Sequence, residues 1–170
     1  MTTAATPALD LVIRAGVVHR VHVYEPPERH GRERDRRPSY GTDAAAALGV
    51  APARVFKTLV ATVDGRVVLA VVSVDRELDL KRLATVCTAR RAALADPAAA
   101  ERATGQVVGG ISPLGSRRPL PVIVDASVHD HETVFVSAGQ RGLQLELAPG
   151  DLVRLSSALS AAITRDVRPG

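Results

Sequence analysis

The spacing of apolar residues changes from helical to strand-like near the start of the chain. Residues 6–16 begin with Thr-Pro, carry apolar side chains at helical spacing and end on glycine. Residues 17–24 then alternate between valines on one face and polar or ring-bearing side chains on the other. We therefore predict a short amphipathic helix over residues 6–16, followed by a half-buried strand over residues 17–24 with its valine face inward.

The middle of the chain combines a strong hairpin signal with three short helices. Residues 54–74 contain two runs rich in β-branched side chains, and the Asp64-Gly65 pair between them is typical of a hairpin turn. Asp79 and Asp96 each stand where a side chain can cap the first turn of a helix. The predicted helices cover residues 42–48, 79–86 and 97–104.

Three further strands and a last helix complete the pattern. The strands are expected to begin at Pro121, Thr133 and Gly142, and the helix at Pro149 or Asp151. Hairpins and isolated helices are mixed, and we find no internal repeat. The sequence therefore predicts a single α+β domain over residues 1–170 with a mixed, largely antiparallel sheet.

Composition indicates a globular protein with an aliphatic core. Hydrophobic residues make up 46% of the chain and aromatic residues only 2%, so Val, Leu, Ile and Ala must fill the core. The longest apolar stretches, such as Val67–Val74, are much shorter than the roughly 20 residues that a membrane span needs. The first residues carry no secretory pattern. We therefore expect a cytoplasmic protein that has no membrane partner.

Positive charge gathers in an arginine-rich surface loop predicted over residues 25–39. Arginine and histidine side chains cluster between Arg29 and Arg37, interleaved with Glu33 and Asp35, in a chain whose formal net charge is +4. Contacts to phosphate groups would explain such a loop, and so would a solvated insertion without a partner.

Two segments stand out as candidates for chemistry. Residues 107–121 hold a glycine pair, a Ser-Pro, a third glycine and two arginines, and glycine lets backbone N–H groups converge on one oxygen. Lys57 interrupts an apolar strand, where a charge must reach solvent, find a partner or enter a pocket. Thr58 faces the other way, so both reach one pocket only if the strand bends. A connecting turn and a lysine directed at water remain the alternatives.

The side chains that usually act as nucleophiles or metal ligands are poorly placed. The histidines show no helical pair at metal-ligand spacing, and His129-Asp130-His131 is more typical of a polar turn. The serines show no nucleophile elbow, and Cys87 lies on a predicted helix as a buried, unreactive thiol. Any hydrolysis must then use positioned water or the substrate's own groups.

Four segments, taken in order, resemble the YbaK/EbsC family of aminoacyl-tRNA deacylases, relatives of the prolyl-tRNA synthetase editing domain. They begin at Thr6, Arg54, Ala95 and Val136, they include the strings FKTL and GGISPLG, and they cover almost the whole chain. The resemblance implies a mixed, partly closed sheet flanked by helices. It also implies trans-editing of the Cys-tRNA(Pro) type, which removes cysteine from mischarged tRNA.

The resemblance assigns roles to individual residues. Lys57 would position the terminal adenosine and its phosphate, and N–H groups of Gly109 and Gly110 would hold the ester carbonyl. The substrate's own thiol would attack that carbonyl, which requires neither a cofactor nor a metal. The residues implied to bind substrate are Tyr24, Tyr40, Thr58, Ser112, Gly115, Ser137 and Gln144.

Gln144 departs from the pattern, because many members that resemble the cysteine-specific enzymes have aspartate there. The contact to the substrate's amino group, and with it the amino-acid preference, therefore stays open. A non-catalytic module that binds tRNA or nucleotides on the same fold is the alternative. The implied partners are the acceptor end of an aminoacyl-tRNA and prolyl-tRNA synthetase, with the arginine-rich loop placed to contact the acceptor stem.

Overall fold

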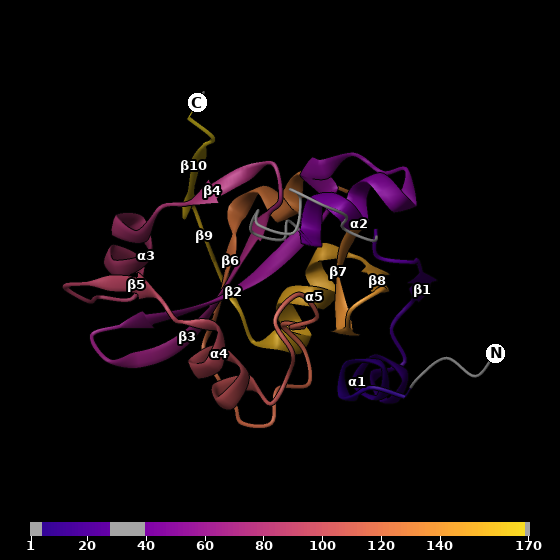
Figure 1. The fold of residues 1–170 in the computed structure, drawn as a ribbon, viewed down its shortest axis with the longest axis horizontal. Helices are drawn as coiled ribbons and strands as arrows, with labels where there is room; N and C mark the ends of the chain where they lie inside the picture. Colours follow the sequence, from indigo (N-terminus) through magenta and orange to yellow (C-terminus); the bar gives the residue numbers. More distant parts are fainter. Residues whose placement is uncertain (1–4, 28–39, 169–170) are drawn as a thin grey trace.

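A computed structural model describes residues 5–27 and 40–168 of the chain, and its architecture is α+β (Figure 1). Residues 28–39, which hold the clustered arginines of the predicted loop, lie outside the described residues. The helices are α1 (Pro7–Ala15), α2 (Tyr40–Leu48), α3 (Leu80–Val86), α4 (Pro97–Thr104) and α5 (Pro149–Ser156), with 3-10 turns η2 (Pro52–Arg54) and η3 (Ala126–Asp130). The strands are β1 (His19–Val23), β2 (Phe56–Val63), β3 (Arg66–Ser73), β4 (Arg76–Leu78), β5 (Ala92–Leu94), β6 (Val122–Asp125), β7 (Val134–Gln140), β8 (Leu143–Leu147), β9 (Leu159–Ala161) and β10 (Thr164–Asp166).

The helix boundaries follow the predicted capping residues, except in α2. The Thr6 hydroxyl accepts the Leu9 N–H at the start of α1, and Asp79 and Asp96 cap α3 and α4 in the same way. Helix α2 begins at Tyr40, before the predicted start, and so includes Gly41. A Cβ atom added at Gly41 would overlap the Val74 side chain. Close packing, which only glycine allows here, therefore outweighs the low helix propensity of this residue.

The strands form three sheets. Five strands pair in the order β5-β2-β3-β6-β9, three in the order β1-β8-β7 and two as β10-β4. The pairs β3-β6 and β6-β9 are parallel and the other ladders are antiparallel, which confirms a mixed, largely antiparallel α+β fold. The expected partial closure is not found among the described strands, because β5 and β9 are the unjoined edges of the large sheet.

Three hydrophobic clusters hold these layers together. The largest lies between one face of β2 and β3, the helices α1 and α5, and the β7-β8 hairpin. A second cluster joins the other face of β2 and β3 to α3. The third contains Ala45, Val55 and Phe135, and it attaches α2 to the three-stranded sheet. In Figure 1, α3 and β5 lie at one end of the molecule, and α2 and the three-stranded sheet lie at the other.

The burial of β1 differs from the prediction, although its orientation does not. Val21 and Val23 pair with Leu145 and Leu143 of the largest cluster, so they lie on the core face of their sheet. They are nevertheless 36% and 73% exposed, because β1 is an edge strand that the core does not cover. On the opposite face His22 and Tyr24 are half-buried, and the His22 ring packs 5.2 Å from the Phe135 ring. No helix in the described part of the chain has the length and apolar character to cross a membrane.

Candidate functional site

Four polar side chains from different strands lie on one face of the sheets. Val55, just before β2, forms a parallel bridge with Phe135, so Lys57 and Ser137, each two residues further on, share the face of that pair. Ser137 pairs with Gln144, and Gln144 pairs with His22. Strand register therefore brings together Lys57, Ser137, Gln144 and His22, which we call the Lys57 face.

The amine of Lys57 is only partly accessible to solvent. Burial lowers the pKa of Lys57 below its ordinary value of 10.5, and the negative charge of Glu77 on β4 acts in the opposite direction. A Cβ atom added at Gly41 would lie 3.7 Å from Lys57 Cβ, so the first turn of α2 packs directly beside this lysine. A cation that has lost part of its hydration in this way gains when a further anionic group approaches.

Gly109 is joined to the same turn of α2 through Tyr40. Its φ angle is +89°, and a Cβ atom added there would lie 2.7–2.8 Å from three carbons of the Tyr40 ring. Since real Cβ atoms do not come so close to an aromatic ring, this contact requires glycine. Gly109 packs on Tyr40 and Lys57 lies beside Gly41. Because Tyr40 and Gly41 are consecutive residues, the first turn of α2 lies between the glycine loop and Lys57.

Gly110 has a structural role that the sequence did not predict. Its N–H donates to the Val107 carbonyl at 2.8 Å, so it is engaged within a turn. A Cβ atom added at Gly110 would lie 2.7 Å from the Arg141 nitrogen and 2.8 Å from the Gln140 carbonyl carbon. The expectation that this N–H points at an ester oxygen is therefore corrected for this conformation. The N–H groups of Gly109 and Ile111 have no acceptor in the described part of the chain.

Two expected substrate contacts in the same loop are turned inward. Ser112 is fully buried, and its hydroxyl accepts the Leu114 N–H while its own N–H donates to the Gln106 amide. Gly115 packs on Pro7 and Ala8 at the start of α1, where a Cβ atom would lie 2.6 Å from the Ala8 nitrogen. Both residues therefore fix the loop instead of facing Lys57.

Thr58 lies on the opposite strand face from Lys57. Its neighbours at alternate positions, Phe56 and Val60, belong to the largest hydrophobic cluster, whereas Ala61 belongs to the cluster under α3. The Thr58 hydroxyl is buried and has no partner within the described residues. The structure therefore does not bring Thr58 to the Lys57 face.

Gln144 offers an unused acceptor on the Lys57 face. The residue is 6% exposed, and its Oε1 atom is buried without a hydrogen-bond partner in residues 5–27 and 40–168. A buried acceptor that lacks a donor costs about 1–3 kcal/mol. A ligand with an N–H or O–H donor would remove that cost. Ser137 beside it accepts the Gly139 N–H at the bulge of β7.

An ion network borders the Lys57 face at Glu146. Its carboxylate accepts hydrogen bonds from His22 at 3.0 Å and from the Thr133 hydroxyl at 2.7 Å, and Arg54 lies 3.5 Å away. Burial acts to raise the pKa of Glu146, but these hydrogen bonds and the Arg54 charge together hold it below 4.5. The carboxylate nearest to Gln144 on β8 is therefore already paired within the protein.

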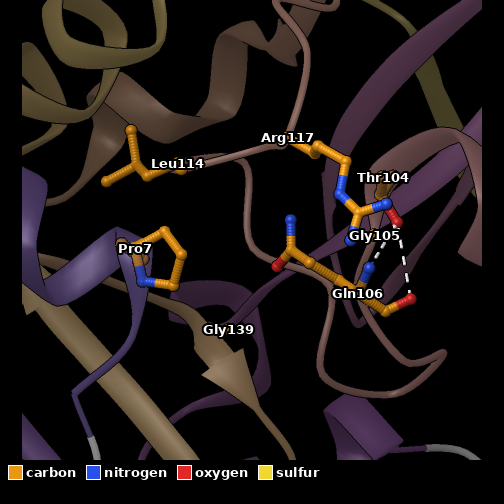
Figure 2. Close-up of a pocket in the computed structure, with 9 residues that line it drawn as sticks. Pro7, Thr104, Gly105, Gln106, Leu114, Arg117 and Gly139 are labelled. Carbon is orange, nitrogen blue, oxygen red and sulfur yellow. Dashed lines mark hydrogen bonds between the residues drawn. The ribbon is translucent and has the colours of Figure 1, made fainter.

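Two cavities lie elsewhere on the described part of the molecule. One has a volume of about 320 Å³. Figure 2 shows residues that line it, among them Gln106, whose backbone is hydrogen-bonded to the Thr104 hydroxyl. The second, of about 280 Å³, lies between β4, α3 and η3. Neither is lined by Lys57 or Gly109. No cluster of three or more potential metal-ligating side chains is found in residues 5–27 and 40–168.

Sequence reasoning missed Arg141. This residue occupies the turn between β7 and β8, its Nε donates to the Val108 carbonyl at 2.8 Å, and its guanidinium stacks 4.8 Å from the Tyr40 ring centroid. An arginine in a hairpin turn is usually solvated, so the string GQRGL contains no signal for these contacts. Tyr24, which the resemblance implied, borders the same turn, where its N–H donates to the Gly142 carbonyl.

Comparisons with known proteins place this geometry in a family. A protein of Enterococcus faecalis, provisionally named Cys-tRNA(Pro)/Cys-tRNA(Cys) deacylase EbsC, is 37% identical over 122 residues, which are 71% of this chain and 74% of that protein. The proline–tRNA ligase of Geobacillus thermodenitrificans is 36% identical over 86 residues, 51% of this chain but only 15% of the ligase.

The fold has a clear counterpart among solved structures. A crystal structure described provisionally as a trans-editing enzyme for prolyl tRNA synthetase superposes with a TM-score of 0.79 at 22% identity, covering 96% of this chain and 99% of that one. At this level of identity the likeness establishes the fold. The model of the aminoacyl-tRNA editing domain matches residues 39–155, which include Lys57, Gly109 and Gln144. Because that match spans most of the chain, and because EbsC is similar over a comparable length, the chain belongs to the aminoacyl-tRNA editing domain family.

Proposed function

We propose that this chain removes cysteine from mischarged tRNA(Pro), acting in trans on the ester that joins the amino acid to the terminal ribose. Membership of the editing family makes the chain an aminoacyl-tRNA deacylase; the amino acid, the tRNA and the chemical mechanism are the proposal. The name of EbsC supports cysteine as the amino acid. The observation that carries the proposal is the Lys57 face, where a partly desolvated amine shares one surface of the sheets with Gln144, whose buried Oε1 atom has no partner among the described residues.

Lys57 would bind the acceptor end through its positive charge. Burial disfavours the charged amine, and Glu77 offsets that effect only in part, since the pKa remains lowered. A phosphate of the terminal nucleotide would restore the lost stabilisation by a charge-assisted hydrogen bond. This argument supports binding of an anionic group of the tRNA end at Lys57.

The glycine loop would hold the ester carbonyl through Gly109. Its N–H and that of Ile111 have no acceptor in residues 5–27 and 40–168, whereas the N–H of Gly110 is engaged with Val107. A donor placed at the developing oxyanion contributes about 2.7–4 kcal/mol to catalysis. In this proposal Gly110 keeps the loop against the β7-β8 hairpin, and Gly109 makes the contact to substrate.

The nucleophile would come from the substrate. Burial raises the pKa of Cys87, which lies at the end of α3, so that its thiol stays protonated and unreactive. In the proposed step the substrate thiolate bonds to its own carbonyl carbon and the ester C–O bond breaks. The ribose oxygen leaves and takes up a proton. The products are free tRNA and a cyclic thioester of cysteine.

Single-turnover release of amino acid from cysteinyl-, alanyl-, seryl- and prolyl-tRNA tests the proposal. Cysteine should be released fastest, and seryl-tRNA much more slowly, because a hydroxyl is less ionised and less nucleophilic than a thiol. Lys57→Ala should slow release about 10- to 150-fold, while Lys81→Ala, which changes the exposed lysine of α3, should not. Equal rates for cysteinyl- and seryl-tRNA would refute the substrate-assisted step, and no release from any of the four would refute the function.

A further inference from the structure

The β7-β8 turn reaches across to the glycine loop through one side chain. Gln140 pairs with Leu143, so the turn consists of Arg141 and Gly142. The Arg141 backbone nitrogen would lie 2.7 Å from a Cβ atom added at Gly110, which means that the turn and the loop are in direct contact. Neither the fold nor the charge of the chain requires arginine at such an exposed turn.

The side chain of Arg141 makes two contacts that point in different directions. Its Nε donates to the Val108 carbonyl at 2.8 Å, immediately before Gly109. Its Cζ atom lies over the Tyr40 ring, 4.8 Å from the ring centroid. A Cβ atom added at Gly109 would lie 2.7–2.8 Å from three carbons of the same ring, so the ring packs on Gly109. Val108, Gly109, Tyr40 and Arg141 therefore form a closed set of contacts, which we call the Arg141 clamp.

We propose that Arg141 is a positioning residue for the deacylation site, holding the Gly109 N–H in register with the start of α2 and hence with Lys57. This inference rests on the proposed function. Without the clamp, the ring packing of Tyr40 on Gly109 would lose the support of the Arg141 side chain, and Tyr40 could rotate away. A displacement of about 1 Å at a reacting centre lowers turnover by up to 100-fold.

The contacts explain why arginine suits this place. A guanidinium can donate from an edge nitrogen and stack with its face at the same time, because it is planar and delocalised. A lysine ammonium can make either contact but not both in a fixed geometry. Arg141→Lys should therefore keep part of the turnover that depends on the clamp. Arg141→Met, which keeps only the aliphatic bulk, should keep none of it.

The experiment measures turnover and loop geometry on the full chain. We expect Arg141→Met to lower single-turnover release of cysteine about 10- to 100-fold, with the apparent Kd for tRNA changed less than about twofold. Arg118→Met removes the same charge from an exposed arginine in the neighbouring loop and serves as the matched control. Denaturation midpoints in urea should be similar for both variants, because both side chains are exposed.

A second readout does not depend on activity. The α proton of Gly109 that takes the place of a Cβ atom points at the Tyr40 ring, so its NMR signal should carry a ring-current shift that Arg141→Met reduces and Arg118→Met leaves unchanged. An unchanged Gly109 signal in Arg141→Met would overturn the clamp, and so would weaker tRNA binding with normal turnover, which would make Arg141 a phosphate contact. If the wild type released no amino acid, the proposed function would be refuted. The Gly109 NMR signal would still test whether Arg141 holds Tyr40 against Gly109.

Discussion

Replacing Gly109 with alanine tests the contact between the glycine loop and Tyr40, on which the geometry of the site depends. The added methyl group would lie 2.7 Å from the Tyr40 Cδ2 atom and 2.8 Å from Cγ and Cε2. Ordinary contacts between carbon atoms are about 3.5–4.0 Å. The ring would therefore have to move by close to 1 Å, which would also disturb its stacking with Arg141.

The magnitude follows from a matched control. Gly65 has a φ angle of +81°, close to the +89° of Gly109, but a Cβ atom there meets nothing within 4 Å. Gly65→Ala therefore measures the cost of positive φ alone. That cost is roughly 1–2 kcal/mol of the free energy of unfolding, and it is partly offset because alanine makes the unfolded chain stiffer. Gly109→Ala should lose about 1–3 kcal/mol more than Gly65→Ala, the usual cost of overpacking.

Urea denaturation of the two variants, followed by circular dichroism, measures this difference. In the double variant Gly109→Ala/Tyr40→Ala, most of the stability lost to overpacking should be recovered, because the removed ring no longer opposes the methyl group. Cysteine release should fall in Gly109→Ala and stay normal in Gly65→Ala. Equal stability of the two single variants, or strictly additive losses in the double variant, would refute the reasoning.

Three further changes test the rest of the site. Lys57→Ala should lower kcat/KM for deacylation about 10- to 150-fold, corresponding to 1.5–3 kcal/mol for a charge-assisted contact, and Lys57→Arg should not restore it; a value near that of Lys81→Ala would exclude Lys57. Gln144→Asp should lower KM for cysteinyl-tRNA about fivefold, because a carboxylate binds the substrate ammonium more strongly than an amide does; an unchanged KM would separate Gln144 from that ammonium. The pKa of Glu146 is held below 4.5, so its ionised form stabilises the fold above that pH and this stabilisation disappears as the pH falls through the folded-state pKa. The Tm difference between wild type and Glu146→Gln should therefore be clear at pH 6 and shrink progressively as the pH falls below 4.5; a constant difference would contradict the assignment.

Local structure was predictable because its causes are close together in sequence. Thr6, Asp79 and Asp96 cap helices through N–H groups two or three residues away, and Asp64-Gly65 adopts the positive φ angles of a tight hairpin. The short strands β4, β5, β9 and β10 were missed, since three residues carry too little alternation to be recognised.

The valine face of β1 lies on the core side of its sheet, as predicted, but its valines are not buried. Alternation indicates that two faces differ, but the neighbouring layers decide how far each face is covered. At β1 the core ends before the edge strand, so Val21 and Val23 stay exposed while Leu143 and Leu145 beside them are buried.

The composition of the site was only partly contained in the sequence. The sequence alone identified Lys57 and the glycine loop as unusual features. It also showed no strong nucleophile pattern. The proximity of the site residues could not be read from it, because Lys57, Ser137 and Gln144 meet through strand pairing between segments far apart in sequence. The same pairing put Thr58 on the other face of the strand.

The inward positions of Ser112 and Gly115, and the clamp formed by Arg141, were decided only by tertiary structure. A serine, a glycine or a turn arginine has the same local preferences whether it faces substrate, a neighbouring loop or water. The packing of the loop on α1, on Tyr40 and on the β7-β8 turn selects among these roles. That selection depends on contacts between segments distant in sequence, which periodicity and propensity do not encode.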